Sequence, residues 1–354
     1  MISAKDIADK LGVSPSAISI AMNNKPGISD ETRQLILQTA AEMGYVHKKR
    51  KTNAGSIIHL FVSSSFTSTV PFDNNMFLDK VIQGISLEAQ QLSYTLHVTY
   101  ISFKDLTAEK IISMLDTSTC GIILLPTAGE MVDPMIMKSL KIPFVTLDKP
   151  AEMYGLDSIT IANAQGISLA VEYLFALGHT NIAHIGGARE FSNFSERIQG
   201  FVNTISLHPE MAGSEQNIFM MDGENNSLGY QESINKIIDK LEKSEKGMPT
   251  AFICATDWYA VSCVQTLASR GYKVPDDISV IGFDNIPISE ITVPRLTTIN
   301  VPKERLGALA VTRLDDIITG RAKERTKISI LTNLVVREST AKAKKVRNRV
   351  GGNK

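Results

Sequence analysis

From Ile57 onward, short apolar segments alternate with longer amphipathic ones, and this alternation constrains the fold more than any other feature of the chain. Nine segments have the apolar run of a strand: 56–63, 94–101, 121–126, 143–148, 158–163, 181–187, 217–222, 250–256 and 279–285. Helical patterns lie between most of them, for example at 77–93, 166–178 and 259–271. Such alternation predicts an α/β protein whose parallel sheets are covered by helices on both faces. Nine or more strands favour two doubly wound lobes over one very wide sheet.

The first 46 residues have a different, all-helical pattern. Ser3 precedes a helical segment that ends at Gly12, and Ser14 followed by Pro15 begins a second one. Serine is a favoured N-cap, and the missing N–H of proline is harmless at the first helical position. Ser29 begins a third helix, whose predicted apolar stripe is Leu35, Ile36, Thr39, Ala40 and Met43. Two helices as close as the first pair form a helix-turn-helix.

Two basic segments flank the α/β region. Residues 47–56, HKKRKTNAGS, carry a run of four cations, and residues 341–354, AKAKKVRNRVGGNK, carry six basic residues and no acid. Neither segment has an apolar period, so we expect a basic linker and a disordered tail. The predicted domains are therefore a helix-turn-helix domain at 1–46, a linker at 47–56, a two-lobed domain at 57–340 and a tail at 341–354.

The overall charge and the cysteines limit the class of protein. The chain has 37 Lys and Arg residues against 37 Asp and Glu residues, so any affinity for nucleic acid has to come from local clusters. Cys120, Cys254 and Cys263 are too scattered for a disulfide framework or a CxxC metal site, which favours a reducing compartment and no metal. No secretory signal or bilayer-spanning apolar run is present. We expect a cytoplasmic protein without a membrane partner.

Long motifs in both regions resemble the LacI/GalR family of bacterial transcription regulators. KDIADKLGVSPSAIS and NNKPGISDETRQLILQTAAEMGY resemble its DNA-binding headpiece, and GHTNIAHIGG, SERIQGF, YKVPDDISVIGFDN and PRLTTI resemble its effector domain in the same order. The resemblance covers nearly the whole chain. It implies a homodimeric repressor with a periplasmic-binding-protein-like core, a palindromic DNA operator as partner, and a ligand between two lobes that changes operator affinity.

The second helix places small, neutral side chains where a helix-turn-helix meets the major groove. Pro15, Ser16, Ser19 and Ile20 recur on one face, while Ile18 and Met22 point inwards. In the family the position of Ile20 is commonly Arg, and losing a bidentate guanine contact removes roughly 1–3 kcal/mol of discrimination. We therefore expect an altered operator at that base pair, unless Ile20 is simply buried against a neighbouring helix.

Phosphate contacts position such a domain without specifying the sequence. The expected contacts are Ser3 and Ser14 at helix starts, Asn23 and Lys25 on the following loop, and Lys48, Lys49, Arg50 and Lys51 in the linker. A run of four charges is more often solvated surface. Its place between a helix-turn-helix and a second domain favours the DNA hypothesis.

The linker also departs from the family pattern. Members usually have Tyr-x-Pro-Asn and then a hinge helix with a Leu that wedges into the minor groove. Here the segment is GYVHKKRKTNAGSI, which is several residues shorter and has no Leu between Tyr45 and Ile57. Kinking by a wedge is therefore not expected, and electrostatic clamping by the linker is the proposed substitute.

Ligands of open parallel sheets bind beyond the carboxyl ends of the strands. Candidates in such places, or at positions that the resemblance implies, are Asn75, Phe77, Asp148, Arg197, Asp257, Trp258 and Asp284. Carboxylates accept and a guanidinium donates the hydrogen bonds that sugar hydroxyls need. Three of these candidates have an alternative role that needs no ligand. Asp257 is alternatively a helix N-cap, Arg197 a member of an ion pair inside one lobe, and Trp258 a core residue.

The resemblance implies a repressor of a carbohydrate-utilisation operon, controlled by a sugar effector. A nucleoside or purine effector is the first alternative. The others are an enzyme, or a sugar-binding protein with no DNA role. An enzyme is disfavoured because GxGxxG, GxxxxGK[ST] and GxSxG are all missing from the sequence, and no cofactor is expected.

Overall fold

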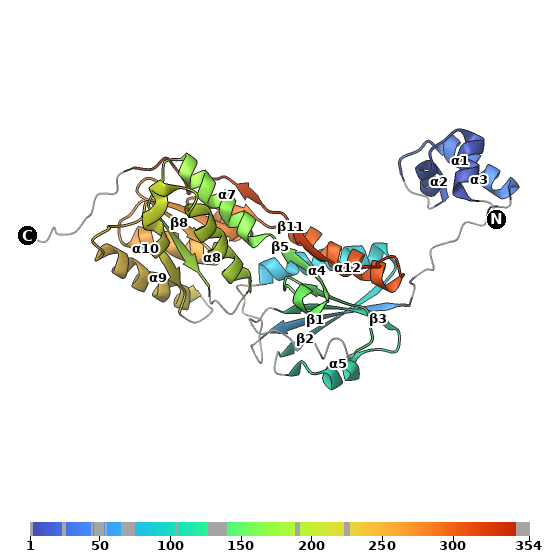
Figure 1. Cartoon of the computed structure of the whole chain (residues 1–354), viewed down its shortest axis with the longest axis horizontal. Helices are drawn as coiled ribbons and strands as arrows, with labels where there is room; N and C mark the ends of the chain where they lie inside the picture. Colours follow the sequence, from blue (N-terminus) through green and yellow to red (C-terminus); the bar gives the residue numbers. More distant parts are fainter. Residues whose placement is uncertain are drawn as a thin grey trace, which may run out of the picture. The chain divides into compact units, whose positions relative to one another are not determined.

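The computed structural model describes the protein in two compact units, residues 1–53 and 54–354 (Figure 1). The described residues are 3–22, 26–43, 45, 53, 55–64, 75–102, 105–126, 140–187, 192–222 and 227–344. Among them, no helix combines the length and apolar character needed to cross a bilayer.

The first unit contains three helices, α1 (Ala4–Leu11), α2 (Pro15–Met22) and α3 (Asp30–Glu42). Ser3 and Ser29 are N-caps as predicted, and Gly12 ends α1 in the left-handed conformation with φ 66°. The core consists of Ile7, Ala8, Ile18, Ala21, Ile36 and Ala40. The predicted stripe on α3 is wrong at Leu35, which is 53% exposed because the small unit buries only the narrow strip around Ile36.

The second unit has two lobes, each built on a six-stranded sheet. In lobe 1 the strand order is β11-β5-β4-β3-β1-β2, and every pairing is parallel. Its strands are β1 (Ile57–Ser64), β2 (Thr95–Ser102), β3 (Thr119–Pro126), β4 (Phe144–Leu147), β5 (Asp157–Ile161) and β11 (Lys327–Ile330). α5 (Ala108–Met114) packs on one face, and α4 (Asn75–Gln91) and α12 (Lys303–Ile318) pack on the other (Figure 1).

Lobe 2 has the strand order β12-β10-β9-β8-β6-β7. Its strands are β6 (Ile182–Gly186), β7 (Ile218–Met220), β8 (Ala251–Cys254), β9 (Ser279–Asp284), β10 (Thr297–Asn300) and β12 (Asn333–Val335). One face carries α7 (Asn163–Ala176) and α8 (Ser192–Ile205), and the other carries α9 (Ser227–Glu242) and α10 (Asp257–Ser269). Short helices complete the unit: η3 (Glu152–Tyr154), η4 (Pro209–Gln216) and α11 (Ile288–Ile291).

The predicted α/β class with doubly wound sheets is confirmed, and all nine predicted strands are present. The strands β10 (TTIN), β11 (KISI) and β12 (NLV) were not predicted, because polar residues interrupt their short apolar runs. β12 also breaks the parallel rule, because it pairs antiparallel with β10. The chain crosses between the lobes after β5, after β10 and between β11 and β12.

The ends of the second unit lie beyond the predicted boundaries. Ser56 belongs to lobe 1, since its carbonyl accepts from the amide of Thr95 at 3.0 Å. Ala341, assigned to the disordered tail by the sequence analysis, accepts a hydrogen bond of 2.9 Å from Nε2 of the buried His179, and Ala343 donates to the carbonyl of Leu177. Residues 341–344 are therefore an ordered strap on lobe 2.

Candidate functional site

Polar side chains from both lobes meet at the carboxyl ends of their strands. Asp148 follows β4 of lobe 1, and Asp284 is the last residue of β9 in lobe 2. Asn193, in the first turn of α8, donates from Nδ2 to Oδ2 of Asp148 at 2.9 Å. The two sheets thus present their carboxyl edges to one shared site, as expected for open α/β sheets.

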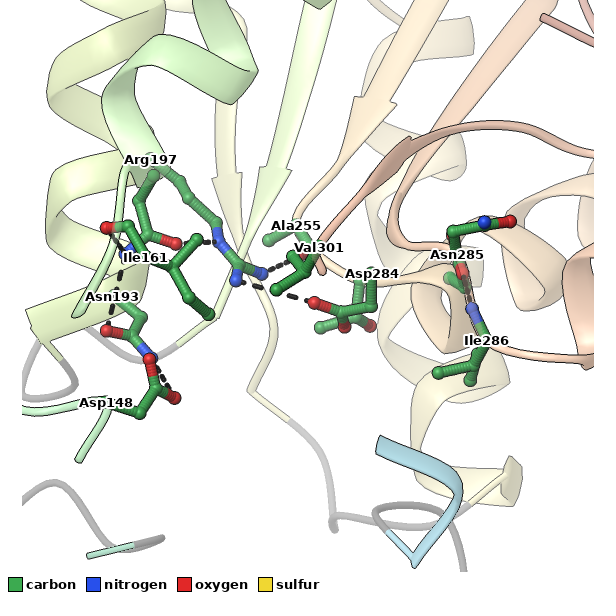
Figure 2. Close-up of polar contacts among 12 residues, drawn as sticks. Asp148, Ile161, Asn193, Arg197, Ala255, Asp284, Asn285, Ile286 and Val301 are labelled. Atoms are coloured by element: carbon green, nitrogen blue, oxygen red, sulfur yellow. Dashed lines mark hydrogen bonds and ion pairs between the residues drawn. The ribbon is translucent and has the colours of Figure 1, made fainter. Parts of the chain in front are cut away.

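Arg197 on α8 is the buried centre of this site (Figure 2). Nε donates to Oδ1 of Asn163 at 2.9 Å, Nη1 donates to the carbonyl of Ala255, and Nη2 lies 3.6 Å from Oδ1 of Asp284. The guanidinium also stacks over the ring of Phe283, 3.6 Å from its centroid. Arg197 and Asp284 therefore form an ion pair inside one lobe, which was the alternative interpretation of Arg197. Each of the three guanidinium nitrogens also faces an acceptor.

Asn163 and Asn193 were missed by the sequence analysis, although both begin a helix that follows a strand. Nδ2 of Asn163 donates to Oε2 of Glu196 at 2.9 Å and is 3.4 Å from Oδ1 of Asn193. Asn163 thus links Asn193 to Arg197, and Figure 2 shows the labelled members of this chain, Asp148, Asn193, Arg197 and Asp284. The signal that would have found Asn163 is its position just after β5, the same rule that selected the aspartates, whereas Asn193 is well separated from the end of β6 at Gly186 and gives no such signal.

The two aspartates are held in unusual backbone conformations. Their φ angles are 59° for Asp148 and 109° for Asp284, a region that residues other than glycine rarely adopt. Burial raises the pKa of Asp148 to about 7, against the opposing effect of Arg197, and burial also raises the pKa of Asp284. Oδ1 of Asp148 is buried without a hydrogen-bond partner among the described residues. A donor from a ligand would satisfy it.

The carboxylate of Asp257 is bonded inside lobe 2, which works against the expected ligand contact. The side chain is fully buried, and its oxygens accept from the amide of Ile286 at 2.8 Å and from Oγ1 of Thr298 at 2.5 Å. The alternative of an N-cap is wrong, because Thr256 caps α10. Burial raises the pKa of Asp257 to about 8. Its role is to hold the turn that follows β9.

Lys303, which the sequence analysis missed, lies at the start of α12. Its Nζ donates to the carbonyls of Asp284, Asn285 and Val301 and is 5.9 Å from the ring centroid of Phe77. Phe77 is half-buried on α4 and contributes an apolar wall to the same region. No cue in the sequence separates Lys303 from the many surface lysines.

Two further ligand candidates are less well placed. Trp258 is half-buried and packs against the apolar cluster of lobe 2, so its alternative role in the core has structural support. Asn75 is the first residue of α4, but its side chain lies outside the described residues. Within the described parts of the chain, no group of three or more His, Cys, Asp or Glu side chains is arranged to hold a metal.

In the first unit, α2 presents a small and uncharged surface. Pro15, Ser16 and Ser19 are exposed and Ile20 is half-buried, next to Gly27, while Ile18 lies in the core. Because Ile20 is only partly buried, its position is compatible with both interpretations: a contact to a base edge and packing against a neighbouring helix. Oγ of Ser14 accepts from the amide of Ala17 at 3.2 Å and shares a hydrogen bond with Ser16.

Ser3 is occupied by a capping box, which works against the expected phosphate contact. Its backbone N–H and hydroxyl both donate to Oδ2 of Asp6, at 2.7 and 2.9 Å. These bonds lower the pKa of Asp6, and the carboxylate repels phosphate at this helix start. Arg33, which sequence reasoning missed, donates to the carbonyls of Ile20 and Ala21 at the end of α2.

The remaining DNA-binding candidates lie outside the described residues: Asn23, Lys25, Lys48, Lys49, Arg50 and Lys51.

Comparisons with known proteins agree with this two-part architecture. Residues 3–47 match the family described as bacterial regulatory proteins, lacI family, and residues 171–340 match a periplasmic binding protein-like domain. The HTH-type transcriptional repressor PurR of Aliivibrio fischeri (strain MJ11) is 27% identical over 351 residues, which is 96% of this chain and 98% of that protein. The HTH-type transcriptional regulator DegA of Bacillus subtilis (strain 168) is 29% identical over 345 residues, covering 95% and 97%.

Solved structures show the same fold over nearly the whole chain. The complex of the transcriptional regulator CelR with cellobiose has a TM-score of 0.67 at 23% identity, covering 96% of this chain and 100% of that one. The lac repressor dimer bound to operator and the anti-inducer ONPF has a TM-score of 0.65 at 22% identity, covering 96% and 99%.

Proposed function

The chain belongs to the LacI family of bacterial transcriptional regulators, and on this premise we propose that it is a dimeric repressor of a carbohydrate-utilisation operon. Its effector is an uncharged sugar held between the two lobes. Asp148, Asp284 and Asn193 bind the sugar hydroxyls, Arg197 orients the carboxylate of Asp284, and Phe77 covers an apolar face of the ring. Effector binding changes operator affinity through the arrangement of the lobes.

The chemical class of the effector is inferred from the bonds that the cationic side chains of the site already make within the protein. All three nitrogens of Arg197 face protein acceptors, and Nζ of Lys303 has three carbonyl partners. In the described part of the site, the charge of Arg197 is therefore opposed by the carboxylate of Asp284, and the three N–H groups of Lys303 are already bonded to carbonyls. Oδ1 of Asp148 instead lacks a donor. Such a site favours a neutral ligand rich in hydroxyl donors over an anion.

The DNA half of the proposal rests on α2 and on the basic linker. Pro15, Ser16, Ser19 and Ile20 meet the base edges, and Ser14 with Asn23 and Lys25 contacts phosphates. Lys48 through Lys51 supply the main phosphate contacts. A single unit of this size buries too little surface to hold a specific site alone, so a dimer on two half-sites is required.

Two experiments test the proposal. In vitro selection from random duplex DNA with the full chain should give a palindrome with two half-sites. Thermal shift and calorimetry should then use matched pairs: galactose with galacturonate, glucose with glucuronate, ribose with ribose 5-phosphate, and adenosine with AMP. We expect binding by a neutral sugar and by none of the anions.

Site variants link a hit to the proposed residues. Asp148→Asn and Asp284→Asn should weaken a hit by about tenfold or more, because each removes a carboxylate acceptor, whereas the exposed Asp276→Asn is the matched control. Tight binding of an anion would contradict the neutral-sugar assignment. Binding of adenosine alone would favour the nucleoside alternative, and chemical turnover of a hit would favour an enzyme.

A further inference from the structure

The ammonium of Lys303 links the two lobes at the candidate effector site. Lys303 begins α12, which packs in lobe 1, and the side chain is only 5% exposed. Its Nζ donates to the carbonyl of Asp284 at 2.5 Å and to that of Asn285 at 3.2 Å, both at the end of β9 in lobe 2. A third bond of 3.2 Å goes to Val301, on the crossover from β10. The three N–H groups of one ammonium therefore have three carbonyl acceptors.

The lobe 1 side of this link is rigid. α12 crosses α4 so closely that a Cβ on Gly84 would lie 2.0 Å from the carbonyl oxygen of Glu304, and one on Gly307 would lie 2.1 Å from that of Val81. Backbone contact at both glycines fixes α12 against α4. If lobe 2 moved relative to lobe 1, Lys303 could move with it only if α4 and α12 moved as well.

The lobe 2 side is a turn with two positive φ angles, 109° at Asp284 and 52° at Asn285. Inside lobe 2, Asn285 is bound to Arg337 and Asn300, with bonds of 2.8 and 3.1 Å. The carboxylate of Asp284 faces Arg197 on α8. The same two residues thus present carbonyls to lobe 1 and a carboxylate to the site proposed for the effector.

We propose that Lys303 is a positioning residue that couples occupation of the effector site to the arrangement of the two lobes. This inference rests on the proposed function for the identity of the site, but not for the link between lobes. When the lobes separate, the carbonyls of Asp284 and Asn285 lose the ammonium and their unusual backbone conformation loses its support. An effector that binds the carboxylate of Asp284 stabilises the same turn, and so favours the arrangement in which Lys303 is bound.

The test measures the distance between lobes in the full chain without ligand or DNA. Spin labels are placed at Glu109→Cys on α5 and Glu232→Cys on α9, two exposed positions in different lobes. The background is Cys120→Ser, since Cys254 and Cys263 are fully buried. Pulsed dipolar spectroscopy of the parent, mixed with excess unlabelled chain so that distances between protomers do not contribute, should give one dominant distance. Lys303→Met, which keeps the chain length and removes the charge, should reduce that population about tenfold.

Three variants make the result specific. Lys303→Arg should restore the parent distance, because a guanidinium also donates to carbonyls. Lys80→Met should leave the distance unchanged, because Lys80 pairs with Glu304 inside lobe 1. Asp284→Ala should shift the distance in the same direction as Lys303→Met, since it weakens the shared turn. If Lys303→Met does not fold, Lys303→Gln takes its place with two remaining donors.

Two outcomes would overturn the inference. An unchanged distance in folded Lys303→Met or Lys303→Gln would show that Lys303 does not hold the lobes. An unchanged distance in Asp284→Ala would show that the effector carboxylate and the link are independent. Neither outcome depends on finding the effector, so failure of this inference is distinct from failure of the proposed function.

Discussion

Asn193 donates a hydrogen bond of 2.9 Å to Asp148, and this bond connects α8 of lobe 2 to the end of β4 in lobe 1. Asp148 and its neighbour in the network, Asp284, come from strands of different sheets. A residue bound across a lobe boundary responds to any ligand that changes that boundary.

The buried carboxyl of Asp148 should make a contribution to stability that falls as the pH rises. Burial raises the pKa of Asp148 to about 7 from its ordinary value of 3.8. Between these values Asp148 binds a proton in the folded protein but not in the unfolded chain, so its contribution to the stability of the second unit decreases with pH. The difference in calorimetric Tm between Asp148→Asn and the parent should therefore increase in favour of the variant from pH 4.5 to 7.5. A slope identical to that of the Asp276→Asn control would contradict this assignment.

Asp257→Ala should destabilise the second unit by about 1–3 kcal/mol, because it leaves the buried amide of Ile286 and hydroxyl of Thr298 without an acceptor. Urea unfolding followed by circular dichroism measures the change. The exposed Asp276→Ala serves as the control. If Asp257 were a ligand contact with no structural role, its variant would unfold like the control.

Gly307→Ala should destabilise lobe 1 by about 1–3 kcal/mol, although alanine favours helices. The added Cβ would lie 2.1 Å from the carbonyl oxygen of Val81, a backbone atom that can yield only by moving α4. Gly213→Ala is a matched control, because a Cβ there would meet nothing within 4 Å. Equal thermal midpoints for the two variants would show that α4 and α12 are free to separate.

Ile20→Arg should change the operator preference at one base pair of each half-site, by roughly 1–3 kcal/mol in favour of guanine. Ile20 is half-buried beside Gly27, so circular dichroism has to show that the variant folds. In vitro selection with parent and variant gives the measurement. Identical half-sites for the parent and the variant would show that Ile20 contributes to the packing of the unit and not to base recognition.

Replacing Lys48, Lys49, Arg50 and Lys51 with Gln should weaken operator binding and reduce its salt dependence. Each lost phosphate contact lowers the slope of log K against log salt by about 0.9. Fluorescence anisotropy between 50 and 200 mM salt measures that slope. The variant Lys342→Gln/Lys344→Gln, in the strap, removes cations elsewhere and should leave the slope unchanged. If the linker variant had the same salt dependence as the parent, electrostatic clamping of DNA by the linker would be excluded.

The local features of the chain could be predicted because they depend on neighbouring residues. The caps at Ser3 and Ser29 and the left-handed turn at Gly12 need only residues within one helical turn. The nine predicted strands lie in apolar segments, because helices cover the faces of their sheets, and such segments are visible in a short window of the sequence. Asp148 and Asp284 were selected by the same kind of rule, as residues at strand ends.

The sequence by itself determined the α/β class, the helical headpiece and the strand ends that carry polar residues, because short-range periodicity and capping specify them. Only the tertiary structure decided what those residues do. It buried Asp257 under a turn, paired Arg197 with Asp284, and brought Lys303 and Asn193 from distant parts of the chain into the site. Such contacts depend on which segments the crossovers between lobes bring together, and no local pattern encodes that long-range choice.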